Sequence, residues 1–188
     1  MTYLVPLAVL IGLSLLLLGW GTALYNAIVR LQNACDESWS EIDTELRRRY
    51  DLIPSLVETV KGYARHERDV LERVTLARNT AAANHGSPVS QAQDENIVVG
   101  SLRQLFALAE NYPDLKANRN FIDLQEELSG TEDRLGRSRR LYNASVRDVN
   151  NRVDAFPSNI VAGMFAFQRR EYFEIDDPAA RKSPAINF

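Results

Sequence analysis

The hydropathy of the chain changes twice, and the changes divide it into three kinds of segment. Residues 2–29 carry no charged side chain, and their middle reads LVPLAVLIGLSLLLLGWGTALY. The next residues are rich in charge and repeat an apolar side chain every three or four positions, which is typical of amphipathic helices. The stretch FPSNIVAGMFAFQRREYF, at 156–173, is apolar again. The pattern therefore predicts an apolar N-terminal segment, a set of amphipathic helices and a separate apolar end.

The N-terminal segment is long enough to cross a bilayer as one helix, because about 20 apolar residues span the ~30 Å hydrocarbon core. A cleaved signal peptide normally has a basic start and a shorter apolar region. No Lys or Arg precedes Arg30, so we favour a retained transmembrane anchor over residues 1–29. Tyr3 near one end, and Trp20 and Tyr25 near the other, are candidate membrane-interface residues.

The distribution of arginines predicts the orientation of this anchor. Arg30, Arg47, Arg48 and Arg49 follow the segment, whereas the other side offers only the α-amine. Positive charge is retained on the cytoplasmic side, and acidic residues count little in this rule. We therefore expect a single-pass membrane protein whose C-terminal domain is cytoplasmic.

An apolar seam at helical spacing comes after the anchor and predicts a helix that runs from the membrane to about Ala83. Its members are Ile42, Leu46, Ile53, Leu56, Val60, Tyr63, Val70, Val74, Ala77 and Ala81. Arg49 and Glu67 interrupt the seam. Pro54 removes the hydrogen bond to the Tyr50 carbonyl, so we expect a kink or a break at that point.

Two further seams predict two more helices. NHGSPVSQAQDEN, at 84–96, reads as a polar loop before the first of them. The seam residues of the second helix are Val98, Leu102, Leu105, Ala109 and Tyr112. Those of the third are Phe121, Leu124, Leu128, Thr131, Leu135, Ser138, Tyr142, Val146, Val149, Val153 and Phe156. Pro157 stops the third helix, and Ser158 or Asn159 can cap a short fourth one that runs to about Phe165.

These segments predict an all-α fold, because no single helix can bury its own apolar stripe. We expect an N-terminal transmembrane helix followed by an antiparallel bundle of three to four long helices over residues 30–175. Residues 176–188, which are polar and contain proline, are expected to be extended or disordered.

Composition and motifs exclude several kinds of chemistry. A net charge of −3 gives no sign of nucleic-acid binding, and the single cysteine, Cys35, cannot form an internal disulfide. His66 and His85 lack the neighbours of zinc or di-iron motifs, and we find no phosphate loop or nucleophile elbow. We therefore predict no catalytic residues, no metal and no cofactor. A turnover abolished by changing His66 or Glu67 would contradict this expectation.

The apolar stretch at 156–173 has two interpretations, which the sequence leaves open. Its side chains either complete the core of the bundle or form a contact with a partner or a membrane. We expect Ile160, Val161, Phe165 and their neighbours to close the end of the bundle. The candidate contact residues are Phe165, Phe167, Arg169, Arg170, Tyr172 and Phe173.

Several stretches together resemble the LemA family of bacterial membrane-anchored proteins. They are RRRYDLIPSLVETVKGYARHE (47–67), VTLARN (74–79), ENYPDLKANRNFIDLQEELSGTEDRLGRSRRLYNASVRDVNNRV (110–153) and FPSNIVAGMFAFQRREYFE (156–174). The resemblance implies one N-terminal transmembrane helix, an antiparallel helical bundle and a C-terminal domain inside the cell. It supplies no catalytic residues to carry over. Relatives are often associated with envelope stress and membrane-protein quality control.

Two non-enzymatic functions fit these expectations. The first is a membrane-anchored scaffold that self-assembles, because helices with long apolar seams can pair between chains as well as within one. The second is an adaptor for a membrane protease or another envelope quality-control partner. The expected partners are accordingly the lipid bilayer, further copies of the chain and another membrane protein.

Overall fold

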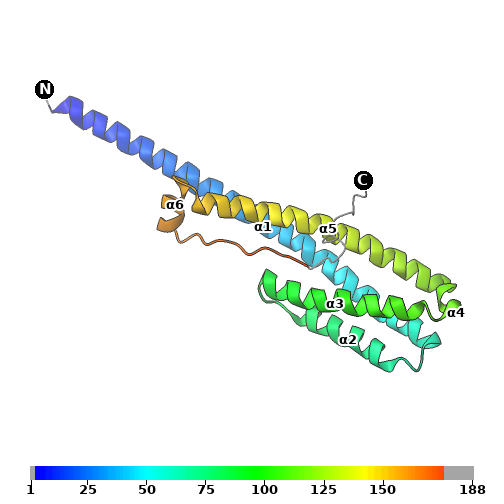
Figure 1. The fold of residues 1–188 in the computed structure, drawn as a ribbon. Coiled ribbons are helices and arrows are strands. Elements are labelled where there is room, and N and C mark those ends of the chain that lie inside the picture. Colours follow the sequence, from blue (N-terminus) through cyan, green and yellow to red (C-terminus); the bar gives the residue numbers. More distant parts are fainter. Residues whose placement is uncertain (1–2, 176–188) are drawn as a thin grey trace, which may run out of the picture. The chain divides into compact units, whose positions relative to one another are not determined.

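The computed structural model describes residues 3–175, and every regular element in this range is a helix (Figure 1). The elements are α1 (Leu4–Tyr63), α2 (Arg68–Ala83), α3 (Pro88–Ala109), α4 (Pro113–Lys116), α5 (Arg119–Asp154) and α6 (Ser158–Met164). The all-α class with a long N-terminal apolar helix is confirmed. The predicted extended tail, at 176–188, lies outside the described residues.

The described residues form two compact units. The first unit contains residues 3–40 and 141–170, and therefore the start of α1, the end of α5 and α6. The second unit contains residues 41–140 and 171–175, with the rest of α1, the helices α2 to α4 and the first part of α5. The division at residue 29 between an anchor and a bundle of three to four antiparallel helices stays a prediction.

The helix α1 continues through Pro54 and ends earlier than the sequence suggested. Pro54 lies inside α1 and is exposed, so of the predicted kink or break the break is wrong, and the kink stays a prediction. Proline removes one backbone hydrogen bond, and the burial of Ile53 and Leu56 on the packed face stabilises the helix on both sides. The expected continuation to Ala83 is also wrong, because α1 ends at Tyr63 and α2 starts only at Arg68.

The second unit contains an antiparallel pair, α2 and α3, which lie side by side (Figure 1). The helix α3 starts at Pro88, so the expectation of a loop up to residue 96 is wrong. Ser87 precedes this proline and accepts a hydrogen bond from the Ser90 N–H, a recognised start of a helix. The predicted seams are buried over most of their length: Ile42, Leu46, Ile53, Leu56, Val60, Val74, Ala77, Ala81, Val98, Leu102, Leu105 and Ala109.

The helix α5 follows its predicted seam as far as Val149, whereas Phe156, the last predicted member, lies beyond the helix and is 79% exposed. Asn118 caps it by accepting a hydrogen bond from the Phe121 N–H at 3.1 Å. The buried seam residues are Phe121, Leu128, Thr131, Leu135, Ser138, Tyr142, Val146 and Val149. The predicted cap of α6 is wrong, because Pro157 holds that position and the Ser158 hydroxyl instead donates to the Ala155 carbonyl at 2.9 Å.

In the first unit, α1 and the end of α5 run in opposite directions. The tilted rings of Trp39 and Tyr142 are in contact, with centroids 5.2 Å apart, whereas Tyr25, earlier in α1, contacts Phe165, which lies beyond α5. Increasing residue number in α1 is therefore matched by decreasing residue number in the partner segment. Ile28 and Cys35 are buried in this unit.

Candidate functional site

The apolar start of α1 has no protein neighbours to cover it. Every large apolar side chain from Tyr3 to Leu18 is more than half exposed. The apolar window of this helix has no buried residue, which distinguishes it from the core helix of a soluble protein. A helix that is apolar on all sides and about 20 residues long fits a bilayer span. Of the predicted interface residues, Tyr3 is 87% and Trp20 is 46% exposed.

An aromatic cluster forms at the end of this apolar segment. The Tyr25 ring lies 4.8 Å from the Phe165 ring and 5.4 Å from the Phe167 ring, measured between centroids. The first charged side chain after the segment is Arg30. The structure therefore brings together Tyr25, predicted to lie at a membrane interface, and two of the predicted contact residues.

The helix α6 divides its apolar side chains between two faces. Val161 and Ala162 are buried. This agrees with the interpretation in which the apolar stretch forms part of the core. Ile160 and Met164, one helical turn apart, are exposed by 53% and 76%. Phe165, at the end of α6, is also 57% exposed, so it does not close the core in the way that was expected.

The residues after α6 are held in place by polar contacts of the first unit. Asn150 accepts a hydrogen bond from the Arg170 N–H at 2.8 Å and donates one to the Arg170 carbonyl at 3.0 Å. The Arg170 guanidinium pairs with Asp36, and that of Arg169 pairs with Asp154, each at 3.0 Å. Both arginines, predicted as contact residues, therefore have carboxylate partners within the chain.

The last two predicted contact residues differ in exposure. Phe173 is fully buried, so its prediction as a contact residue is wrong: its ring belongs to the core. Tyr172 is 37% exposed. A contact by Phe165, Phe167, Arg169, Arg170 and Tyr172 stays a prediction.

The second unit contains a buried polar network that the sequence analysis missed. Arg49 is 1% exposed and donates to the Glu95 carboxylate at 2.7 Å, and Glu95 is fully buried. A second Arg49 nitrogen donates to Glu132 on α5. The Tyr50 hydroxyl also donates to Glu95, and the Gln91 amide donates to the Tyr50 oxygen at 3.0 Å. The network therefore connects α1, α3 and α5.

Burial controls the ionisation of this network, which lies well outside the apolar segment. Burial raises the pKa of the Glu95 carboxyl, while Arg49 and the donated hydrogen bonds lower it. Burial, with the nearby Glu95 carboxylate, raises the pKa of the Tyr50 hydroxyl far above its ordinary value. Among the described residues, every buried side-chain nitrogen or oxygen atom has a hydrogen-bond partner. The network is thus satisfied internally.

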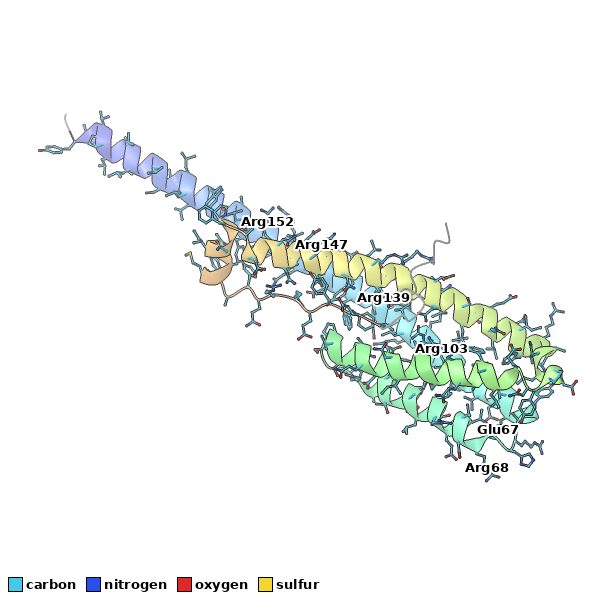
Figure 2. The ribbon with its side chains drawn as sticks, in the orientation of Figure 1. Glu67, Arg68, Arg103, Arg139, Arg147 and Arg152 are labelled. Carbon is cyan, nitrogen blue, oxygen red and sulfur yellow. The ribbon has the colours of Figure 1, made fainter. Side chains whose placement is uncertain are left out.

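A cleft of about 440 Å³ lies beside the network in the second unit. Its lining is mainly apolar and includes Leu102, Phe106 and Leu128. Arg103 and Arg139, labelled in Figure 2, contribute charged groups, and the Arg139 guanidinium donates to the Ile175 carbonyl at 3.2 Å. Such a lining suits an apolar group with a polar edge.

Two signals in the sequence pointed to this network. Arg49 lies at helical spacing between Leu46 and Ile53, in line with the apolar seam, and therefore on the buried face. Counting back from Val98 at the same spacing gives Glu95, once residues 88–96 are recognised as helical. The incorrect loop assignment concealed that second position.

The described residues contain no cluster of three His, Cys, Asp or Glu side chains that could hold a metal. His66 is exposed, and Glu67 accepts a hydrogen bond from the Tyr112 hydroxyl at 3.3 Å. Glu67 and Arg68 are labelled at the start of α2 in Figure 2. Neither His66 nor Glu67 belongs to the lining of the cleft.

Comparison with known sequences agrees with the resemblance seen in the motifs, because the sequence pattern of the LemA family matches residues 38–188. The chain belongs to the LemA family. It is 28% identical to Protein LemA of Metamycoplasma hominis over 140 residues, which cover 73% of this chain and 63% of that protein. The family assignment made from the quoted motifs is therefore confirmed.

Magnetosome proteins named MamQ are also similar to this chain. Magnetosome protein MamQ 2 of Paramagnetospirillum magneticum is 23% identical, over 80% of this chain and 64% of that protein. Magnetosome protein MamQ of Magnetospirillum gryphiswaldense is 23% identical, over 89% of this chain and 72% of that protein. The chain thus matches slightly less than two thirds of the length of the first two relatives. Family membership and the exposed apolar helix together indicate a membrane-associated protein.

Proposed function

We propose that this LemA-family protein is a non-enzymatic, single-pass scaffold of a bacterial cell membrane, with its C-terminal part in the cytoplasm. The observation that carries the proposal is the continuity of α1 within the first unit. The apolar segment and the residues that pack in this unit belong to one uninterrupted helix. Tyr25 contacts Phe165, and Ile28 is fully buried, only a few residues after the apolar run.

This continuity favours a scaffold because it leaves no flexible linker between the membrane segment and the folded residues of the first unit. A linker would let a domain search a volume around its anchor, with a reach that grows with its length. A continuous helix instead presents the packed residues at a defined height above the membrane.

Self-assembly is part of the proposal, and the second unit offers a surface for it. A groove of about 360 Å³ along α2 and α3 is lined by Leu76 and Ile97, which are 68% and 58% exposed. We propose a second copy of the chain as its occupant, because these two apolar side chains lie outside the buried seams, and the groove lining also carries charges of both signs, Arg73 and Asp94, so that it can pair with its own copy.

The test is the mass of the assembly formed by the full chain in a mild membrane mimic, compared with a chain that starts at Gln32. A uniform oligomer of the full chain is the expected result. An oligomer of the shorter chain as well would assign assembly to the remaining helices, whereas its loss would assign assembly to residues 1–31, which include the anchor and the packed Tyr25 and Ile28. Monomers in both samples would overturn the self-assembling scaffold.

Substitutions can assign the assembly to the groove. Leu76→Glu together with Ile97→Glu should lower the assembled mass if the groove holds a second copy. Leu141→Glu is the matched control, because Leu141 is 57% exposed, lies on α5 and does not line the groove. An unchanged mass for the groove variant would assign assembly to another surface.

The alternative function is an adaptor for a membrane protease or another quality-control partner, and the cleft beside Arg49 is the observation that favours it. Its apolar lining, with Leu102, Phe106 and Leu128, can receive an apolar side chain of a different protein. Copurification separates the two functions, because an adaptor retains a different protein in stoichiometric amount. Loss of that protein on Phe106→Ser would assign it to the cleft.

A further inference from the structure

We infer that α6 and its flanking residues lie in the interfacial layer of the same bilayer that α1 crosses, as a second membrane contact. The inference rests on the proposed membrane anchoring and adds a specific segment, depth and occupant to it. The occupant is lipid, and the contact residues are Phe156, Ile160, Met164 and Phe165.

The length of α1 sets the depth at which Tyr25 lies. From Leu4 to Tyr25 a helix rises about 32 Å, at roughly 1.5 Å per residue. This rise matches the ~30 Å thickness of the hydrocarbon core. With the start of the apolar segment at one boundary, Tyr25 therefore lies at the other, where aromatic rings with a polar group are favoured. Arg30, the first charged residue, comes just outside.

The aromatic cluster shows that the residues at the end of α6 lie at the same height along α1 as Tyr25. Phe165 and Phe167 both pack on the Tyr25 ring, at 4.8 and 5.4 Å. All three residues belong to the first unit. A ring in contact with Tyr25 lies at nearly the same height along the α1 axis, so the end of α6 is placed at the membrane boundary.

The exposed side chains near that boundary have the chemistry of an interfacial segment. Phe156 is 79%, Met164 76%, Phe165 57% and Ile160 53% exposed, all within ten residues of sequence. The opposite side of α6, with Val161 buried, is already packed against protein. An interfacial segment of this kind places apolar side chains at the boundary between headgroups and acyl chains.

Polar residues around this apolar group remain on the protein or solvent side. Asn150 holds the backbone of Arg170, and Asp154 pairs with Arg169, so these groups stay hydrogen-bonded beside the apolar side chains. Arg152, close to the end of α5 (Figure 2), is exposed and can contact lipid headgroups. Lipid is favoured over a protein partner because Phe165, which is exposed, contacts Tyr25 at the end of the exposed apolar segment of α1.

The test measures the depth of a fluorescent label in the full chain, reconstituted in vesicles of phosphatidylcholine and phosphatidylglycerol. An NBD label is attached at Met164→Cys in a Cys35→Ala background. Leu141→Cys is the matched control, because Leu141 is also an exposed apolar residue of the first unit. It precedes Tyr142, whose ring contacts that of Trp39, and Trp39 lies about 21 Å beyond Tyr25 along α1.

Lipids with a nitroxide placed shallowly in the bilayer should quench the Met164→Cys label several-fold more than the Leu141→Cys label. The emission of the Met164→Cys label should also shift to the blue. Equal, water-like emission and equal quenching at both sites would overturn the inference. A blue shift without quenching by the lipid nitroxide would also overturn it, because it would assign the surface to a protein neighbour such as a second copy of the chain.

Anchoring is measured in the same samples, so that its failure is distinguished from failure of the inference. Protein that floats with vesicles after an alkaline wash is anchored, whatever the label reports. If the Cys35→Ala background does not fold, p-benzoylphenylalanine at Phe165 replaces the label. Photocrosslinking to lipid supports the inference, and crosslinking to protein alone contradicts it.

Discussion

Replacing Arg49 with Met should strongly destabilise the second unit, because it leaves the Glu95 carboxylate buried without its cation. The two charges of this pair are almost completely removed from water, with side-chain exposures of 2% for Arg49 and 0% for Glu95. Removing one partner of such a pair costs about 3–5 kcal/mol. In a chain of this size the loss corresponds to a fall of about 6–20 °C in Tm.

The second ion pair of Arg49 provides an internal contrast. The Glu132 side chain is 53% exposed, so water screens its charge and solvates it when the pair is broken. Glu132→Gln should therefore cost less than about 1 kcal/mol. The Arg49 guanidinium thus forms two ion pairs that contribute very differently to the free energy of unfolding, because Glu95 is buried and Glu132 is half exposed.

Thermal unfolding of the full chain in a membrane mimic, followed by circular dichroism, tests this reasoning. Arg48→Met is the control, because Arg48 is the exposed neighbour of Arg49 on the same helix. Arg49→Met combined with Glu95→Gln should be more stable than Arg49→Met alone, since the buried position then carries no unpaired charge. The reasoning is refuted if Arg49→Met unfolds at the wild-type temperature, or if the double variant recovers nothing.

Other contacts carry three further predictions. The pKa of the Tyr50 hydroxyl is raised in the folded protein, so this group stabilises the fold at pH values below ~10, its ordinary pKa. Above that pH the free energy of unfolding should fall by up to about 1.4 kcal/mol per pH unit. Tyr50→Phe should make the stability depend less steeply on pH in this alkaline range. Asn150→Ala should release the backbone at Arg170 and accelerate tryptic cleavage there, whereas a change at the exposed Asn151 should not. The Cys35 thiol is buried, and burial raises its pKa, so thiol reagents should modify it quickly only in denaturant.

Much of the helical core could be predicted because its signal is local. The spacing of Val98, Leu102 and Leu105 identifies one buried face, and all three side chains are buried. The same reasoning placed α5 within two residues at each end. Such seams are readable because a helix brings every third or fourth residue to one side, whatever the rest of the fold does.

The polar network could not be inferred from the same spacing alone. A charged residue in an apolar seam, such as Arg49, indicates either an interruption or a buried ion, and the choice depends on what faces it. Its partner Glu95 lies 46 residues away in the sequence and on another helix. Two long-range facts were needed at once: that residues 88–96 are helical and that α3 faces α1 at this height.

The role of the apolar end was equally dependent on distant residues. Phe165 and Phe173 are both aromatic members of one short stretch, yet the first is 57% exposed and the second is fully buried. The two residues belong to different compact units: Phe165 to the first, within residues 141–170, and Phe173 to the second, within residues 171–175. Composition identifies such a stretch as apolar but cannot divide it between core and surface.

The last turns of the apolar segment of α1 also take part in the packing of the first unit. Tyr25 carries the two phenylalanine rings, and Ile28, one turn later, is completely buried. Each residue inserted in a helix rotates the remainder of that helix by about 100°, so a foreign anchor joined with the wrong phase would turn Ile28 out of its packing. The apolar segment therefore cannot be replaced by any helix of equal hydrophobic length. A replacement must also keep the rotation of α1 about its axis, so that Ile28 stays in its packed position.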